Sequence, residues 1–165
     1  MTELEFALNT FYLLMSGALV MWMAAGFTML EAGLVRSKNA SEIVTKNLGL
    51  FSIACVMYLT CGFFIMYPGD SAISSWIPGF SFSYLSLGMS SQDMSYGSYS
   101  EASDFFFQVV FVATAMSIVS GAVAERMKLL PFFAFAVILT GFIYPVQGYW
   151  KWGGGGLDAL GYTDF

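Results

Sequence analysis

The 165-residue chain contains 58% hydrophobic and 10% charged residues and carries a formal net charge of −5. This composition excludes an ordinary soluble domain, and the acidic balance offers no basic surface for nucleic acid. The chain contains no histidine, and we find no phosphate-binding glycine loop, no nucleophile beside a base and no metal-ligand spacing. We therefore expect neither an enzyme nor a metal or cofactor site.

Four apolar runs are each long enough, at about twenty residues, to cross about 30 Å of hydrocarbon. They cover residues 11–34, 48–67, 105–124 and 129–150. The predicted fold class is an all-α polytopic membrane protein with four transmembrane helices in this chain. Because Glu3 and Glu5 precede the first run in place of basic residues, we expect this run to remain as a helix and not to be a signal peptide.

Basic residues gather in one set of connections between these runs. Five of the six precede the second or fourth run: Arg36, Lys38, Lys46, Arg126 and Lys128. The positive-inside rule places both connections in the cytoplasm, and the N-terminus and the 68–104 segment outside the cell membrane. The 68–104 segment is rich in serine and glycine and holds scattered aromatic residues, which is typical of an ordered extracellular loop.

Glu31 is the one acid inside an apolar run, near the inner end of the first helix. An acid within a membrane helix is a candidate functional residue. Because Arg36 and Lys38 follow closely, we favour a structural ion pair or snorkelling for Glu31 over a functional role. Glu125, at the inner end of the third run, is expected to be a neutralised or capping partner.

The third run contains a pattern with a repeat of four residues. Ala113, Ser117 and Gly121 form a stripe of small residues that permits close helix packing. Phe107 and Phe111 also stand four residues apart, so their rings lie on one helix face, about 6 Å apart along the axis. On this pattern alone, lipid-facing or packed phenylalanines are the commoner interpretation.

Two features mark the end of the chain. Four successive glycines follow Trp152 and are incompatible with an ordinary helix interior, so we expect a break there. Asp164 follows Thr163 after a further glycine, a local pattern typical of a helix N-cap.

Four blocks of sequence carry a family resemblance: Gly26-Phe-Thr-Met-Leu-Glu-Ala-Gly-Leu-Val-Arg-Ser-Lys-Asn39, Asp104-Phe-Phe-Phe-Gln-Val-Val-Phe111, Ser120-Gly-Ala-Val-Ala-Glu-Arg126, and Trp152-Gly-Gly-Gly-Gly-Leu157 with Gly161-Tyr-Thr-Asp-Phe165. In this order and spacing they resemble the N-terminal portion of the ammonium transporter (Amt/Mep/Rh) family, over essentially the whole chain. The resemblance implies a bundle of about eleven transmembrane helices per subunit, assembled as a homotrimer with one pore in each subunit.

The resemblance also implies roles for five residues. Phe111 matches the gate phenylalanine, Phe107 matches the one in the outer vestibule, and Gln108 lies on the same helix. Trp152 matches the tryptophan that faces the recruited cation, and Asp164 matches the buried acid below that site. For Asp164 we favour a structural role over proton transfer. Aromatic faces suit this task because each attracts a cation by about 0.5–2 kcal/mol without trapping it.

The chain departs from the family pattern in one respect. The paired pore histidines, the serine beside the cation site and the second gate phenylalanine of the family are absent from these 165 residues. We therefore expect this chain to be part of a longer protein and to hold half of a transport site. That protein would interact with ammonium or ammonia, the lipid bilayer and, as a further candidate, a cytoplasmic signal-transduction protein.

Three functions are compatible with this sequence. The first is passage of ammonium or ammonia across the cell membrane, with cation recruitment at an outer aromatic site. The alternative is an ammonium-sensing membrane receptor module fused to a signalling domain. The third is a structural membrane subunit of four helices.

Overall fold

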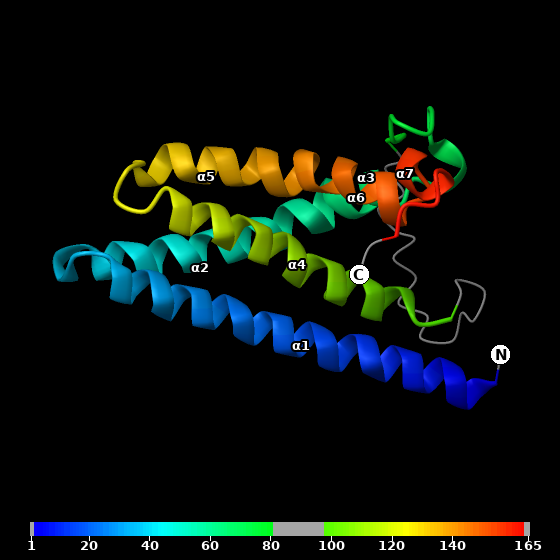
Figure 1. The fold of residues 1–165 in the computed structure, drawn as a ribbon, viewed down its shortest axis with the longest axis horizontal. Helices are drawn as coiled ribbons and strands as arrows, with labels where there is room; N and C mark the ends of the chain where they lie inside the picture. Colours follow the sequence, from blue (N-terminus) through cyan, green and yellow to red (C-terminus); the bar gives the residue numbers. More distant parts are fainter. Residues whose placement is uncertain (1, 81–97, 164–165) are drawn as a thin grey trace.

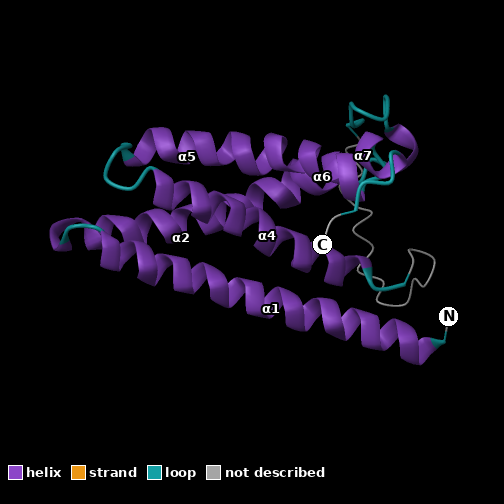
Figure 2. Cartoon of the chain, in the orientation of Figure 1, coloured by secondary structure: helices purple, strands orange, loops and turns teal. Residues whose placement is uncertain are grey.

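The computed structural model describes residues 2–80 and 98–163. This part of the chain is helical and contains no strand (Figure 2). The elements in chain order are α1 (Glu3–Leu34), the 3₁₀ turn η1 (Ser37–Asn39), α2 (Ala40–Met57), the π-helical turn η2 (Tyr58–Gly62), α3 (Phe63–Met66), the 3₁₀ turn η3 (Gly69–Ser71), α4 (Glu101–Ala122), α5 (Leu129–Ile138), the π-helical turn η4 (Leu139–Ile143), α6 (Tyr144–Trp152) and α7 (Gly156–Ala159).

These elements form four long rods that run side by side with alternating direction (Figure 1). The first is α1, the second joins α2, η2 and α3, the third is α4, and the fourth joins α5, η4 and α6. All four are long and apolar enough to cross a membrane. The predicted all-α fold with four transmembrane helices is therefore confirmed for the described residues.

Three helices begin before the apolar runs that predicted them: α1 at Glu3, α2 at Ala40 and α4 at Glu101. α1 begins at Glu3 because Thr2 and Glu5 form a reciprocal capping box: Thr2 Oγ1 accepts from Glu5 N, and Glu5 Oε2 accepts from Thr2 N. α2 begins at Ala40, so Lys46 lies on a helix and not in the connection before it. Hydropathy detects the part of a helix that suits hydrocarbon, whereas backbone hydrogen bonding continues into the polar turns.

Two π-helical turns face each other in the second and fourth rods, a feature that sequence periodicity did not predict. Cys61 Sγ in η2 lies 3.6 Å from the carbonyl oxygen of Gly141 in η4. Pro145 follows η4 in the first turn of α6. Because proline has no N–H to donate, a wide turn just before it accommodates the missing hydrogen bond without ending the rod.

The glycine run breaks the fourth rod as expected. α6 ends at Trp152, and Gly154 adopts a φ of +78°, a region that side chains disfavour. A Cβ at Gly153 would lie 2.0 Å from the carbonyl oxygen of Met66. The chain can therefore turn closely against the end of α3 and start the short helix α7.

The small-residue stripe on α4 lies against the first two rods. Ala113 and Ser117 are buried, and Ser117 shares a small cleft with residues of α1 and α2. A Cβ at Gly121 would come within 3.6 Å of Glu31 Oε1 on α1. The helices pack closely along this stripe, in line with the predicted use of small side chains.

Glu31 pairs with a different cation from the one that we predicted. The expected partners were Arg36 and Lys38, but Glu31 Oε2 lies 3.5 Å from Lys46 Nζ, and both side chains are buried. Ser120 Oγ and Asn47 Nδ2 also donate to Glu31 Oε2, over 2.8 and 3.1 Å. The predicted partners were wrong because they were chosen by their closeness to Glu31 in sequence, whereas α2 turns the more distant Lys46 toward Glu31.

Arg36 pairs instead with Glu125. The Glu125 carboxylate accepts from the backbone N–H and Nε of Arg36 over 3.0 and 3.1 Å, and from Asn39 Nδ2 over 2.6 Å. The first of these bonds, then that from Asn39, hold the pKa of Glu125 below its usual range. As predicted, Glu125 is a neutralised partner, and it ties the α1–α2 connection to the α4–α5 connection.

The opposite end of the bundle carries the start of α1, the end of α6 and the short helix α7 (Figure 1). Residues 68–80 are held against α6 and α7 by three hydrogen bonds. Tyr149 Oη donates to Ser74 O over 2.8 Å, Trp150 Nε1 donates to Trp76 O over 2.8 Å, and Gly156 N donates to Ser75 O over 2.6 Å. This part of the predicted loop is ordered, while residues 81–97 lie outside the described ranges.

Candidate functional site

A cavity of about 450 Å³ lies between the helices near the end of the bundle that carries the 68–80 segment. Its volume falls in the range typical of small-ligand sites. The residues that line it are Leu13, Tyr67, Tyr99, Asp104, Phe107, Gln108, Phe111, Tyr144 and Trp152. They come from α1, the residue after α3, the segment before α4, α4 itself and α6, so all four rods contribute to the wall.

One face of α4 supplies four of these residues. Asp104, Phe107, Gln108 and Phe111 are spaced at i, i+3, i+4 and i+7, which places them on the same side of a helix. The Phe107 and Phe111 ring centroids are 4.9 Å apart with an interplanar angle of 56°. α4 therefore presents a column of two aromatic rings with polar groups beside it.

Side-chain hydrogen bonding and charge shape the polar part of the wall. Gln108 Nε2 donates to Tyr67 Oη over 3.1 Å, which fixes the amide across the cavity from α4 to the end of α3. Asp104 is 4% exposed, although its side chain lines the cavity. Burial, and then the negative charge of Asp104, raise the pKa of the Tyr99 phenol.

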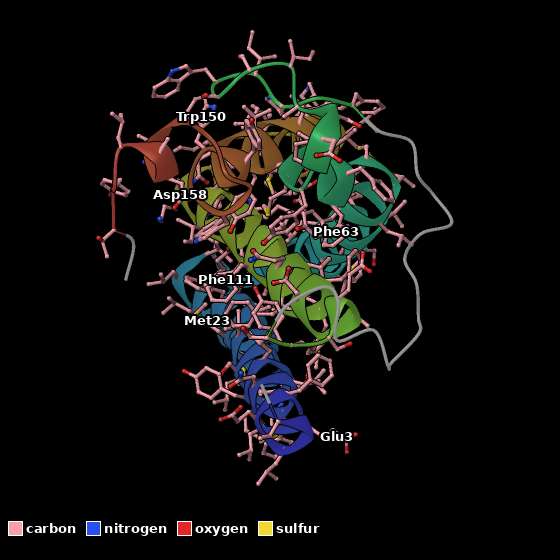
Figure 3. All side chains as sticks on the ribbon, turned by 90° about the vertical axis from the view of Figure 1, so that its right-hand side faces the viewer. Glu3, Met23, Phe63, Phe111, Trp150 and Asp158 are labelled. Carbon is pink, nitrogen blue, oxygen red and sulfur yellow. The ribbon has the colours of Figure 1, made fainter. Side chains whose placement is uncertain are left out.

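Below the cavity the bundle becomes apolar. Phe111 packs against a buried cluster that includes Ala54, Tyr58, Val110 and Ala113. Figure 3 looks along the rods from the end that carries the cavity and shows Phe111 near the middle of the molecule, with Trp150 and Glu3 toward its periphery. A hydrated ion in the cavity would therefore meet an apolar barrier at the level of Phe111.

The four sequence-predicted site residues that are described lie on the wall of one cavity. These are Phe107, Gln108, Phe111 and Trp152, of which Trp152 comes from α6 and the others from α4. Asp164, the fifth, lies outside the described residues. Residues far apart in sequence are thus brought together at the predicted end of the bundle.

Sequence reasoning missed the remaining wall residues. Asp104 had a detectable signal, because it precedes Phe107 by three residues and therefore shares its helix face. Tyr67, Tyr99 and Tyr144 had none, since their positions depend on how separate helices pack. Within residues 2–80 and 98–163, no group of three His, Cys, Asp or Glu side chains is placed to hold a metal ion.

Comparison with known proteins places this geometry in context. The Ammonium Transporter Family profile matches residues 11–165. A Synechocystis protein described as an ammonium transporter is 39% identical over 163 residues, which cover 99% of this chain and 36% of that protein. Ammonium transporter Amt2 of Archaeoglobus fulgidus is 35% identical over 155 residues, which cover 94% of this chain and 31% of that protein.

A solved structure agrees with these sequence relatives. A protein named Sensor Amt Protein matches with a TM-score of 0.85 and 33% sequence identity, covering 100% of this chain and 40% of the other. The chain spans about a third of the length of the curated relatives that it matches. The family profile matches this multi-pass membrane chain along nearly its whole length. The chain therefore belongs to the Ammonium Transporter Family, a family of transporters and not of enzymes.

Proposed function

We propose that this chain forms the outer part of a path by which ammonium or ammonia crosses the cell membrane. The observation that carries the proposal is the single cavity that gathers Phe107, Phe111 and Trp152 from two helices. Each aromatic face attracts a cation by about 0.5–2 kcal/mol, depending on how far the cation is desolvated. Such rings can hold ammonium at the outer end of the path and release it again.

Selectivity follows from hydrogen bonding in the same cavity. Ammonium carries four N–H donors in fixed directions, whereas a potassium ion of similar size has none. The Gln108 carbonyl group and the phenol oxygens of the wall provide acceptors beside the rings. Such directed acceptors favour ammonium over potassium, since potassium gains no directed hydrogen bond from them.

The apolar level at Phe111 determines the form in which the substrate continues. A bare cation loses several kcal/mol or more of hydration free energy on entering hydrocarbon-like surroundings. Neutral ammonia loses far less, so we propose that ammonium gives its proton to water in the outer cavity and that ammonia alone crosses the level of Phe111. Asp164 remains a proposed acid below the cation site, with a mainly structural role.

Orientation and assembly belong to the same proposal. The turns that carry four of the six basic residues (Arg36, Lys38, Arg126 and Lys128) lie together at one end of the bundle, so the positive-inside rule favours a cytoplasmic location for that end and an outer location for the N-terminus (Figure 1). We further propose a homotrimer with one path per subunit, and binding of a cytoplasmic signal-transduction protein at the inner end. Cross-linking in native membranes would test the trimer.

Uptake of radiolabelled methylammonium by cells that express the full-length gene product tests the function. Phe111→Ala and Trp152→Ala should change the rate of uptake or its inhibition by potassium, because each removes one ring from the cavity. Matched controls are Phe142→Ala and Trp22→Ala, since these side chains are 46% and 73% exposed on the bundle surface. Equal behaviour of all four variants and the wild type would contradict the assigned roles.

The similarity to Sensor Amt Protein favours one second candidate, an ammonium-sensing receptor module. In that case the same cavity would bind ammonium, and occupancy would be passed to a fused signalling domain. The domain content of the full-length gene product distinguishes the two functions. A kinase-like or cyclase-like domain together with absent methylammonium uptake would favour sensing, whereas uptake without such a domain would favour transport.

A further inference from the structure

Asp104 is a nearly buried carboxylate on the wall of the outer cavity. It is 4% exposed, and a buried ionised group is costly unless another charge or hydrogen bonds compensate it. Among the residues that the structure describes, no lysine or arginine lines the cavity. Lys151, the basic residue next to Trp152, pairs instead with Asp158 over 2.6 Å. Among the described residues, Asp104 therefore has no cationic partner in a salt bridge.

The helix to which Asp104 belongs explains why the charge is tolerated. Asp104 lies in the first turn of α4, where the positive end of the helix dipole favours an anion. Glu101 stands in the same turn, so α4 already has an acid at its N-terminus. The side chain of Asp104 faces the cavity, where it forms hydrogen bonds with the side chains of Gln108 and Tyr67. A purely capping role does not account for this placement.

The field of this carboxylate extends into the cavity. After burial, its negative charge is the further reason that the pKa of Tyr99 is raised. Phe107, Gln108 and Phe111 follow Asp104 on the same face of α4. A monovalent cation that sits against the aromatic rings would therefore also sit in the field of the carboxylate.

We infer that Asp104 is a substrate-binding residue, whose carboxylate supplies the fixed negative charge that holds an ammonium-type monovalent cation against the rings of the outer cavity. The inference rests on the proposed function and adds a counter-charge on the cavity wall to the predicted set of Phe107, Phe111, Trp152, Gln108 and Asp164. The carboxylate also accepts hydrogen bonds from N–H donors, so it strengthens capture of ammonium more than capture of potassium.

The test measures methylammonium uptake against substrate concentration, again with the full-length gene product. Asp104→Asn keeps the shape and removes the charge, so we expect KM to rise about tenfold or more, which corresponds to about 1.4 kcal/mol, with the maximal rate within about twofold of wild type. Asp104→Glu should keep KM within about threefold. Asp70→Asn makes the same substitution on an exposed residue of the outer connection and should leave KM unchanged.

A second variant keeps the inference testable if Asp104→Asn does not reach the membrane. Gln108→Glu adds a carboxylate to the same helix face and should lower KM, because it adds negative charge to the cavity wall. An unchanged KM in Asp104→Asn, equal losses in Asp104→Asn and Asp104→Glu, or an unchanged KM in Gln108→Glu would overturn the inference. In each case wild-type uptake would leave the proposed function intact, whereas no wild-type uptake would refute that function itself.

Discussion

The buried ion pair between Lys46 and Glu31 predicts a large and specific loss of stability when its cation is removed. Lys46→Met keeps most of the length of the side chain and removes the charge. The change deletes the contact between Lys46 Nζ and Glu31 Oε2 at 3.5 Å and the hydrogen bond from Nζ to Ser120 O at 3.0 Å. It also removes the cation from above the Phe132 ring, whose centroid lies 5.1 Å from Nζ.

The expected magnitude follows from burial. The Lys46 and Glu31 side chains are 7% and 4% exposed, so water cannot replace the lost partner. Removing one member of a buried pair destabilises a protein by about 3–5 kcal/mol. Asn47 and Ser120 still donate to Glu31 Oε2, which favours the lower part of this range, while Glu31 Oε1 has no hydrogen-bond partner in the described residues.

A double variant separates the charge from the packing. In Glu31→Gln with Lys46→Met no buried charge remains, and the new carbonyl group can accept the same two donors, so at least half of the lost stability should return. Arg36→Met is the surface control, because Arg36 is 66% exposed in its pair with Glu125, and should cost less than about 1 kcal/mol.

Chemical unfolding of the full-length gene product in detergent micelles, followed by tryptophan fluorescence, provides the measurement. The expected order of stability is wild type, Arg36→Met, the double variant and then Lys46→Met. If Lys46→Met were no less stable than Arg36→Met, the buried pair would not contribute as argued. If the double variant were the least stable, packing and not the unpaired charge would control the loss.

Three further predictions concern the two ends of the bundle. The backbone N–H of Arg36, with other donors, lowers the folded-state pKa of Glu125. The stability that the ionised Glu125 contributes is therefore present at neutral pH and is lost as the pH falls below the ordinary glutamate pKa of about 4.3. Glu125→Gln should flatten this acid dependence of the unfolding midpoint. Gly153→Ala should lower the thermal midpoint because its Cβ would lie 2.0 Å from a carbonyl oxygen of α3, whereas Gly26→Ala, with no atom within 4 Å, should not. Tyr149→Phe removes a 2.8 Å hydrogen bond to the 68–80 segment and should speed limited proteolysis of that segment.

The sequence predicted the fold well because membrane crossing depends on length and apolar character, which are local properties. Each of the four runs became part of a helix that is long enough to span a bilayer. The predictions that failed depend on packing in three dimensions. Lys46 was assigned to a connection, but α2 begins six residues before it and turns it toward Glu31. The paired π-helical turns likewise arise from the contact between two rods.

The candidate site likewise contains residues that a local pattern relates to one another and residues that only helix packing brings together. Phe107, Gln108 and Phe111 share a helix face by spacing alone, and Asp104 fits that spacing too, although it was not among the predicted site residues. The tyrosines of the wall come from other helices, so no local pattern could connect them to α4. Trp152 joined the predicted set only through the family resemblance, because its position on the wall depends on how α6 packs.

Among the described residues, Glu31 and Asp104 are nearly buried acids, and the desolvation cost of a buried charge can be offset in two ways. Glu31 meets Lys46 and two hydrogen-bond donors, so its charge is compensated within the fold. Asp104 faces an open cavity and lacks a lysine or arginine partner among the described residues. Since a buried carboxylate without a cationic partner gains most from a cation that comes and goes, the proposed role of Asp104 would make its cavity attract positive charge, whereas the charge of Glu31 is already paired.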